Sequence, residues 1–135
     1  NLTEVTEEVI SGHGELILLC DDDADIRETT CNVLESIGYQ TVTASDGLEA
    51  VELYKSRKKD VSMIMMDVVM PRLGGVQAVE RIMEINPDAK VLFSTGYDKE
   101  ETLHSEMPGE EYVVLSKPYD IARLSQVIHE HLKKE

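Results

Sequence analysis

The sequence predicts an α/β protein in which a parallel sheet is covered by helices on both faces. Short aliphatic runs alternate with amphipathic helical patterns along the chain. The runs at residues 61–66 (VSMIMM) and 90–94 (KVLFS) are too apolar for strands with one exposed face, and such strands are typical of the middle of a parallel sheet. Parallel neighbours need crossover connections, which are right-handed. We therefore expect a doubly wound sandwich built around a five-stranded parallel sheet.

The predicted strands are short runs rich in β-branched and aliphatic residues. They cover residues 15–20, 40–44, 61–66, 90–94 and 111–115. In a doubly wound sheet the functional crevice lies at the carboxyl ends of the strands, so the residues directly after each run are the first candidates for a site.

The first two predicted helices have clear boundary signals. An apolar stripe from Ile26 to Ile37 stops at Gly38, a natural glycine just beyond a helix end. The second helix follows two capping candidates, Ser45 and Asp46.

The later helices differ in the strength of their patterns. The third stripe, residues 76–83, is stopped by Asn86-Pro87, and the last one begins behind Pro118 with Asp120 as its predicted N-cap. A fourth helix is predicted near residues 99–107, although KEETLHSEM contains few apolar side chains.

Composition limits the classes of function. The chain has 135 residues, enough for one compact domain. It carries 27 acidic residues against 13 basic ones, a formal net charge of -14. Because this surface repels phosphate backbones and anionic lipid, we expect neither direct nucleic-acid binding nor membrane contact. The two cysteines, Cys20 and Cys31, have no metal-ligand spacing and are interpreted as reduced core thiols of a cytoplasmic protein.

The first residues differ in character from the rest. Residues 1–14 are polar, lack periodicity and end in Gly-His-Gly, so we interpret them as a linker or partly ordered lead-in to a domain spanning 15–135. No stretch approaches the ~18 apolar residues of a membrane span, and no signal-peptide pattern is present. The chain opens on Asn1, and we expect it to be a piece of a longer protein.

Polar residues with matching chemistry follow four of the predicted strands. Asp21 and Asp22 follow the first, Asp67 the third, Thr95 the fourth and Lys117 the fifth. Two unit charges ~4 Å apart repel by ~4 kcal/mol at an effective dielectric constant of about 20, so converging carboxylates require a cation. Oxygen-only ligands favour a hard ion, and Mg²⁺ fits a site with few protein carboxylates.

Such a site has a direct chemical use. A carboxylate held beside Mg²⁺ is a nucleophile towards phosphorus, while an ammonium and a hydroxyl stabilise charge on the phosphoryl oxygens. Asp67 is the natural acceptor because it ends the most apolar central strand.

Four segments together resemble the signatures of the receiver domain of two-component response regulators. They are ILLCDDDADIRE, MMDVVMPRLGG, FSTG and LSKPY, and the resemblance runs from about Glu15 to Leu132. It implies a flavodoxin-like strand order 2-1-3-4-5. It also implies that the domain catalyses its own phosphorylation without being a turnover enzyme.

The resemblance assigns roles to individual residues. Asp67 would be the phosphoacceptor, Asp21 and Asp22 would hold Mg²⁺, and the backbone carbonyl of Val69 would be a further ligand. Thr95 would be the switch hydroxyl and Lys117 its salt-bridge partner. Asp23 falls at a position that does not bind metal, and we interpret it as the N-cap of the first helix. The family's aromatic switch position is Val114 here, and Tyr112, two residues earlier, is a candidate substitute.

The resemblance also suggests partners. The segments GHGELILLCDDD and LFSTGY are most similar to the corresponding segments in receivers of hybrid sensor histidine kinases. We therefore expect the C-terminal receiver of such a kinase, which exchanges phosphate with the kinase core or with a histidine phosphotransfer protein and forms weak homo-oligomers or none.

Three other classes of function would use some of the same residues. A haloacid-dehalogenase-like phosphatase would use a DxD motif, and Asp21 and Asp23 have that spacing, yet the chain leaves no room for a cap domain. A flavodoxin-like FMN carrier would need a phosphate-binding loop after the first strand. The acidic segment DDDAD at this position would repel that phosphate. An unphosphorylated interaction module would not need Asp67, the acidic pair and Lys117 together.

Overall fold

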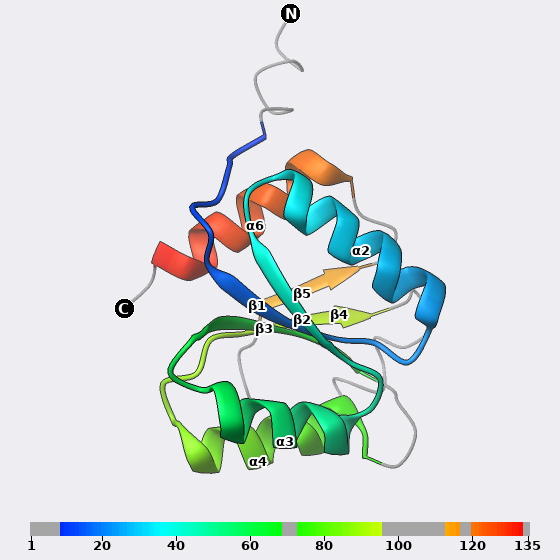
Figure 1. Ribbon diagram of the computed structural model, residues 1–135, viewed down its shortest axis with the longest axis vertical. Helices are drawn as coiled ribbons and strands as arrows, with labels where there is room; N and C mark the ends of the chain where they lie inside the picture. The colour runs from blue at the N-terminus through cyan, green and yellow to red at the C-terminus, as the bar shows by residue number, and fades with distance from the viewer. Residues whose placement is uncertain (1–8, 69–72, 96–112, 117–119, 134–135) are drawn as a thin grey trace, which may run out of the picture.

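A computed structural model describes residues 9–68, 73–95, 113–116 and 120–133 (Figure 1). The strands are β1 (Leu16–Cys20), β2 (Gln40–Ala44), β3 (Val61–Asp67), β4 (Val91–Thr95) and β5 (Val113–Ser116). The helices are α2 (Ala24–Ser36), α3 (Gly47–Arg57), α4 (Gly75–Ile85) and α6 (Ile121–Lys133). None of these helices is long and apolar enough to cross a membrane.

The strands form one parallel sheet in the order β2-β1-β3-β4-β5. Helices α2 and α6 cover one face, and α3 and α4 cover the other (Figure 1). The expected parallel α/β sandwich is therefore confirmed. The helix predicted near 99–107 lies outside the described residues, as do the first two residues of the strand predicted at 111–115.

The helix boundaries follow the predicted capping signals. Asp23, Asp46 and Asp120 each accept a hydrogen bond from a backbone N–H in the first turn of α2, α3 and α6, at 2.7 to 3.1 Å. These bonds satisfy backbone donors that have no partner within the helix. Of the two capping candidates before α3, the structure assigns the cap to Asp46, while Ser45 bonds the Glu49 carboxylate. Gly38 follows α2 with a φ of 102°, as expected.

Strand alternation divides the core into two layers. Met63 and Met65 of β3 pack on the side of α2 and α6, whereas Ile64 and Met66 pack on the side of α3 and α4. All four are buried. Because successive strand residues point to opposite faces, Asp67 continues the row of Met63 and Met65 towards α2 and α6.

Part of the predicted lead-in contacts the sandwich. The Ile10 N–H donates to Ser125 Oγ of α6 at 3.0 Å, and the Gly12 N–H donates to the Ile37 carbonyl at 2.6 Å. Residues 1–8 lie outside the described residues. The domain boundary at residue 15 stays a prediction, but residues 9–14 are hydrogen-bonded to both α6 and the end of α2.

Gly12 is expected to tolerate no side chain. A Cβ built on it would lie 2.4 Å from Cε1 of Tyr39, whose ring is buried. We expect Gly12→Ala to destabilise the protein by about 1–3 kcal/mol, because either the ring or the segment must move. Thermal unfolding compared with the exposed neighbour variant Ser11→Ala measures this. Equal midpoints for the two variants would show that residues 9–14 do not contribute to the fold.

Candidate functional site

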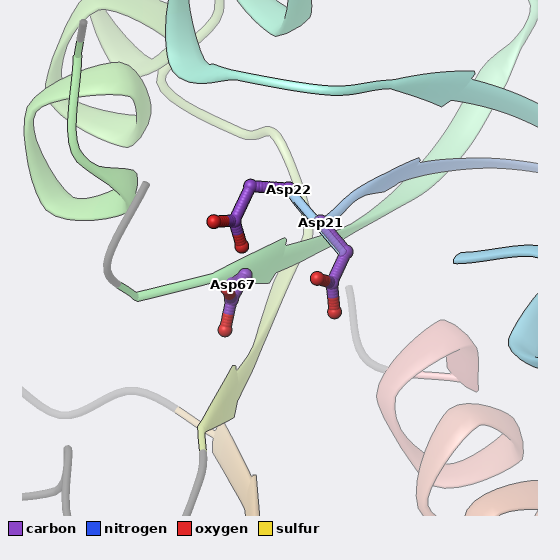
Figure 2. A group of neighbouring side chains, drawn as sticks. All are labelled: Asp21, Asp22 and Asp67. Carbon is purple, nitrogen blue, oxygen red and sulfur yellow. The ribbon is translucent and has the colours of Figure 1, made fainter. Parts of the chain in front are cut away.

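Three aspartates lie together at the carboxyl edge of the sheet (Figure 2). One carboxylate oxygen from each of Asp21, Asp22 and Asp67 lies within 4.8 Å of the others. Asp67 is 1% exposed and Asp21 is 3% exposed, whereas Asp22 is open to solvent. The structure thus brings together the carboxylates that the sequence placed at the ends of two separate strands.

The pairing of β1 with β3 explains this convergence. Cys20, the last residue of β1, is the partner of Met66 in β3. The residues that follow, Asp21 and Asp67, therefore reach the same edge of the sheet side by side. Since β3 is buried on both faces, the Asp67 backbone is held by apolar packing on either side.

Backbone contacts hold the segment that carries Asp21. Its N–H donates to the Ala44 carbonyl at 3.2 Å, and its Oδ1 accepts from the Asp23 N–H at 2.9 Å. The Arg27 guanidinium donates through Nη1 to the Asp21 carbonyl at 2.7 Å. Arg27 was not among the predicted site residues. Its place one turn after the N-cap Asp23 is the only sequence signal that it could reach back to the strand end.

The site is a region of concentrated negative charge. Burial raises the pKa of the Cys20 thiol well above its usual range, and the carboxylates of Asp46, Asp67 and Asp21 raise it further. The thiol is therefore protonated at neutral pH and donates to the Asp46 carbonyl at 3.3 Å. This agrees with the interpretation of Cys20 as a core residue. A field that disfavours a thiolate favours a bound cation.

The other predicted site residues are described only in part. Thr95 ends β4, next to β3 in the sheet, and its backbone pairs with Ser116 of β5. Val69 and Lys117 lie outside the described residues, as does Tyr112. Their assigned roles stay predictions.

A glycine at the start of α4 permits close contact between this helix and the backbone of Asp67, the phosphoacceptor candidate. The Gly75 N–H, at the start of α4, donates to the Val68 carbonyl at 2.8 Å. A Cβ on Gly75 would lie 1.9 Å from the Asp67 carbonyl oxygen. Only glycine therefore lets α4 begin this close to the end of β3.

The parallel α/β sandwich and the three aspartates at its carboxyl edge are the features expected of a receiver domain. The family model of the response regulator receiver domain matches residues 17–129. The chain belongs to this family, and it is a receiver domain of two-component signalling.

Curated relatives agree with this assignment. The response regulator receiver protein CpdR of Brucella abortus (strain 2308) is 32% identical over 116 residues, which cover 86% of this chain and 95% of the relative. The chemotaxis protein CheY of Treponema pallidum (strain Nichols) is 32% identical and covers 87% of this chain and 82% of its own. The sensor kinase CckA of Brucella abortus (strain 2308) is 30% identical over 93% of this chain, which spans only 13% of that kinase.

Solved structures share the fold. A receiver domain protein from Clostridium thermocellum has a TM-score of 0.79 at 26% identity and covers 87% of this chain and 93% of its own. The complex CheX-CheY-BeF3-Mg+2 from Borrelia burgdorferi contains a chain with a TM-score of 0.80 at 26% identity, covering 91% of this chain and 92% of that one.

Proposed function

We propose that Asp67 accepts a phosphoryl group from a phosphohistidine and that Asp21 and Asp22 bind the Mg²⁺ needed for this transfer. The observation that carries the proposal is the cluster of three carboxylates at the carboxyl edge of a receiver sheet. Asp67 is the acceptor because it is buried at the end of β3, with its backbone held by packing on both sides. The related CheY complex with BeF3 and Mg+2 supports the same chemistry.

The donor set fits Mg²⁺. The cluster offers carboxylate oxygens only, and hard oxygen ligands of this kind are the ones that Mg²⁺ prefers. Asp21 and Asp22 would hold the ion together with Asp67 and the backbone carbonyl of Val69. When bound, Mg²⁺ supplies positive charge that screens the carboxylates from the incoming phosphoryl oxygens.

The protein groups then perform the transfer. An Asp67 carboxylate oxygen attacks phosphorus in line, the bond from phosphorus to the histidine nitrogen breaks, and its electron pair returns to the imidazole. Lys117 and Thr95 are proposed to stabilise the phosphoryl oxygens, Lys117 as a cation and Thr95 as a hydroxyl donor. The product is an acyl phosphate on Asp67.

The haloacid-dehalogenase alternative is not favoured. It would use Asp23 as the second carboxylate of a DxD motif. The Asp23 side chain instead caps α2, where its Oδ1 accepts from the Asp25 and Ile26 N–H groups. A carboxylate engaged with the helix backbone is not directed at a substrate phosphate.

The partner is proposed to be a histidine-bearing domain. We infer that the chain is the C-terminal receiver of a hybrid sensor histidine kinase, in the cytoplasm, because the sensor kinase CckA contains a segment similar to nearly all of it. The kinase core or a histidine phosphotransfer protein would exchange phosphate with Asp67. The assignment to a hybrid kinase is tested by determining the sequence upstream of Asn1, because the proposal requires a kinase core there.

Phosphorylation by acetyl phosphate in the presence of Mg²⁺ tests the proposed function. Mass spectrometry of the intact chain is expected to show the addition of one phosphoryl group, and peptide mapping is expected to place it on Asp67. A chain whose mass stays unchanged under these conditions would exclude the proposal.

Removal of Mg²⁺ is expected to lower stability. A ligand that binds only the folded state stabilises it by RT ln(1 + [L]/Kd), which is about 1.4 kcal/mol at ten times Kd. We therefore expect millimolar Mg²⁺ to raise the thermal midpoint of the wild-type chain and EDTA to reverse the rise. Asp21→Asn should abolish the response, whereas Asp23→Asn should retain it. An equal response in Asp21→Asn and the wild-type chain would move the ion away from this cluster.

A further inference from the structure

Arg27 connects the first turn of α2 to the end of β1. Its Nη1 donates to the Asp21 carbonyl at 2.7 Å, and its side chain is half-buried. Its backbone N–H donates to the Asp23 carbonyl at 2.9 Å, which places the residue in the first turn of the helix. One side-chain hydrogen bond therefore closes the chain from Asp21 to Arg27 into a ring.

This bond restrains the peptide group that joins two of the proposed Mg²⁺ ligands. The Asp21 carbonyl belongs to the peptide group between Asp21 and Asp22. The atoms of a peptide group, including both Cα atoms, lie close to one plane. A restraint on this carbonyl therefore restrains the directions in which both side chains leave the backbone.

The two ligands depend on this restraint to different degrees. Asp21 is 3% exposed, and its Oδ1 accepts from the Asp23 N–H at 2.9 Å. Asp22 is open to solvent, so packing does not hold its side chain. The place of Asp22 in the carboxylate cluster therefore depends on the backbone that Arg27 holds.

The charge of Arg27 and its hydrogen bond act on Mg²⁺ binding in opposite directions. The segment DDDADIRE, residues 21–28, contains no other basic residue. A fixed cation near the cluster repels Mg²⁺, whereas ligands that are ordered in advance bind the ion with a smaller loss of conformational entropy. The sign of the effect on Mg²⁺ affinity therefore shows which contribution is larger.

We propose that Arg27 is a positioning residue for the Mg²⁺ site and that its hydrogen bond outweighs its charge. Arg27 contacts neither the ion nor the phosphoryl group. It holds the peptide group between Asp21 and Asp22 in the orientation in which both carboxylates meet Asp67. This inference rests on the proposed function, because it requires the carboxylate cluster to bind Mg²⁺.

Three substitutions in the intact chain separate the bond from the charge. Arg27→Met removes the charge and the donors and keeps an unbranched stem. Arg27→Lys keeps the charge, but its ammonium is a flexible point charge without the planar fork of donors. Arg57→Met is the matched control, because Arg57 ends α3 at the opposite edge of the sheet, where its Nε lies 3.7 Å from Oδ2 of Asp60.

Mg²⁺ uptake is measured by titration calorimetry in the absence of a phosphate donor. Thermal unfolding without Mg²⁺ establishes that each variant is folded at the temperature of the titration. Labelling by acetyl phosphate at saturating Mg²⁺ is then followed by intact-mass spectrometry.

The expected result is a loss of Mg²⁺ affinity at Arg27 alone. Arg27→Met should bind Mg²⁺ about tenfold more weakly than the wild type, the value of one hydrogen bond from a charged donor. Arg27→Lys should bind at least about threefold more weakly, because it keeps the repulsive charge and loses the guanidinium bond. Arg57→Met should stay within about twofold of the wild type, since its charge is distant and screened. At saturating Mg²⁺ the labelling rate of Arg27→Met should stay within about threefold of the wild-type rate, because the acceptor is unchanged.

An effect of charge alone has the opposite sign. It would make Arg27→Met bind Mg²⁺ more tightly and would leave Arg27→Lys equal to the wild type. Unchanged or tighter binding by a folded Arg27→Met chain would overturn the inference, and so would wild-type affinity in Arg27→Lys. An equal loss of affinity in Arg57→Met would overturn it as well.

Failure of the proposed function gives a different pattern. A wild-type chain that takes up no Mg²⁺ would remove the proposed ion site and this inference with it. A wild-type chain that takes up Mg²⁺ but is not labelled would remove the role of Asp67 as acceptor, while the calorimetry would still decide the role of Arg27.

Discussion

Asp67→Asn is expected to abolish labelling of the chain by acetyl phosphate. The asparagine amide keeps the size and shape of the side chain, but it is neutral and is a poor nucleophile towards phosphorus. A negative charge is also removed from a cluster in which carboxylate oxygens lie within 4.8 Å, so the fold should be unharmed or stabilised. Intact-mass spectrometry after incubation with acetyl phosphate and Mg²⁺ measures the loss.

Asp23→Asn is the matched control for this experiment. It makes the same chemical change in the same acidic segment, but Asp23 caps α2 and lies outside the carboxylate cluster. Asparagine is as good an N-cap as aspartate, so both stability and labelling should be close to wild type. Labelling of Asp67→Asn at the wild-type rate would show that another residue is the acceptor. Turnover of a phosphate ester by Asp67→Asn would point to a phosphatase with its nucleophile after β1.

Gly75→Ala is expected to cause the largest loss of stability among the variants considered. The new Cβ would lie 1.9 Å from the Asp67 carbonyl oxygen, a contact with backbone that no rotamer change can relieve. The start of α4 and the end of β3 must separate, at a cost of about 3 kcal/mol, which lowers the thermal midpoint by about 10 °C in a domain of this size. Alanine has a higher helix propensity than glycine. The expected loss of stability would therefore occur although the substitution itself favours the helix.

The same variant should slow phosphorylation of the fraction that remains folded. Movement of the β3 end displaces the Asp67 backbone, and small displacements of a reacting group lower rates strongly. Gly74→Ala is the matched control. The nearest contact of its Cβ would be the flexible end of the Gln77 side chain at 2.6 Å, and the nearest backbone atom, the Val68 carbonyl oxygen, lies 3.7 Å away. If Gly75→Ala were as stable and as readily labelled as Gly74→Ala, this close contact would not constrain the site.

The acidic cluster was predictable because it depends on order along the chain. Carboxyl ends of parallel strands share one edge, so aspartates directly after two apolar runs had to meet there once the runs were recognised as strands. The capping role of Asp23 was equally local, since an N-cap is defined by the residues that follow it. Both predictions required periodicity and position, and neither required knowledge of a distant contact.

Other features depend on contacts that no local pattern contains. Ser94 lies beside Asp67 only because of the register between β3 and β4, and Gly75 meets the Asp67 carbonyl only because of the angle at which α4 returns to the sheet. The contacts that residues 9–14 make with Ile37 and with Ser125 could not be predicted from the sequence for the same reason. Gly-His-Gly is an ordinary loop signal whether or not the backbone around it is docked.

The amino-acid sequence by itself thus determined the fold class, the edge of the sheet that carries the site and the identity of the three carboxylates. Strand period, capping residues and the position of charge after apolar runs are local properties, and local properties can be read from order alone. Only the tertiary structure decided which uncharged groups surround Asp67 and how closely. Those neighbours are set by strand register and helix docking, which result from packing the whole chain.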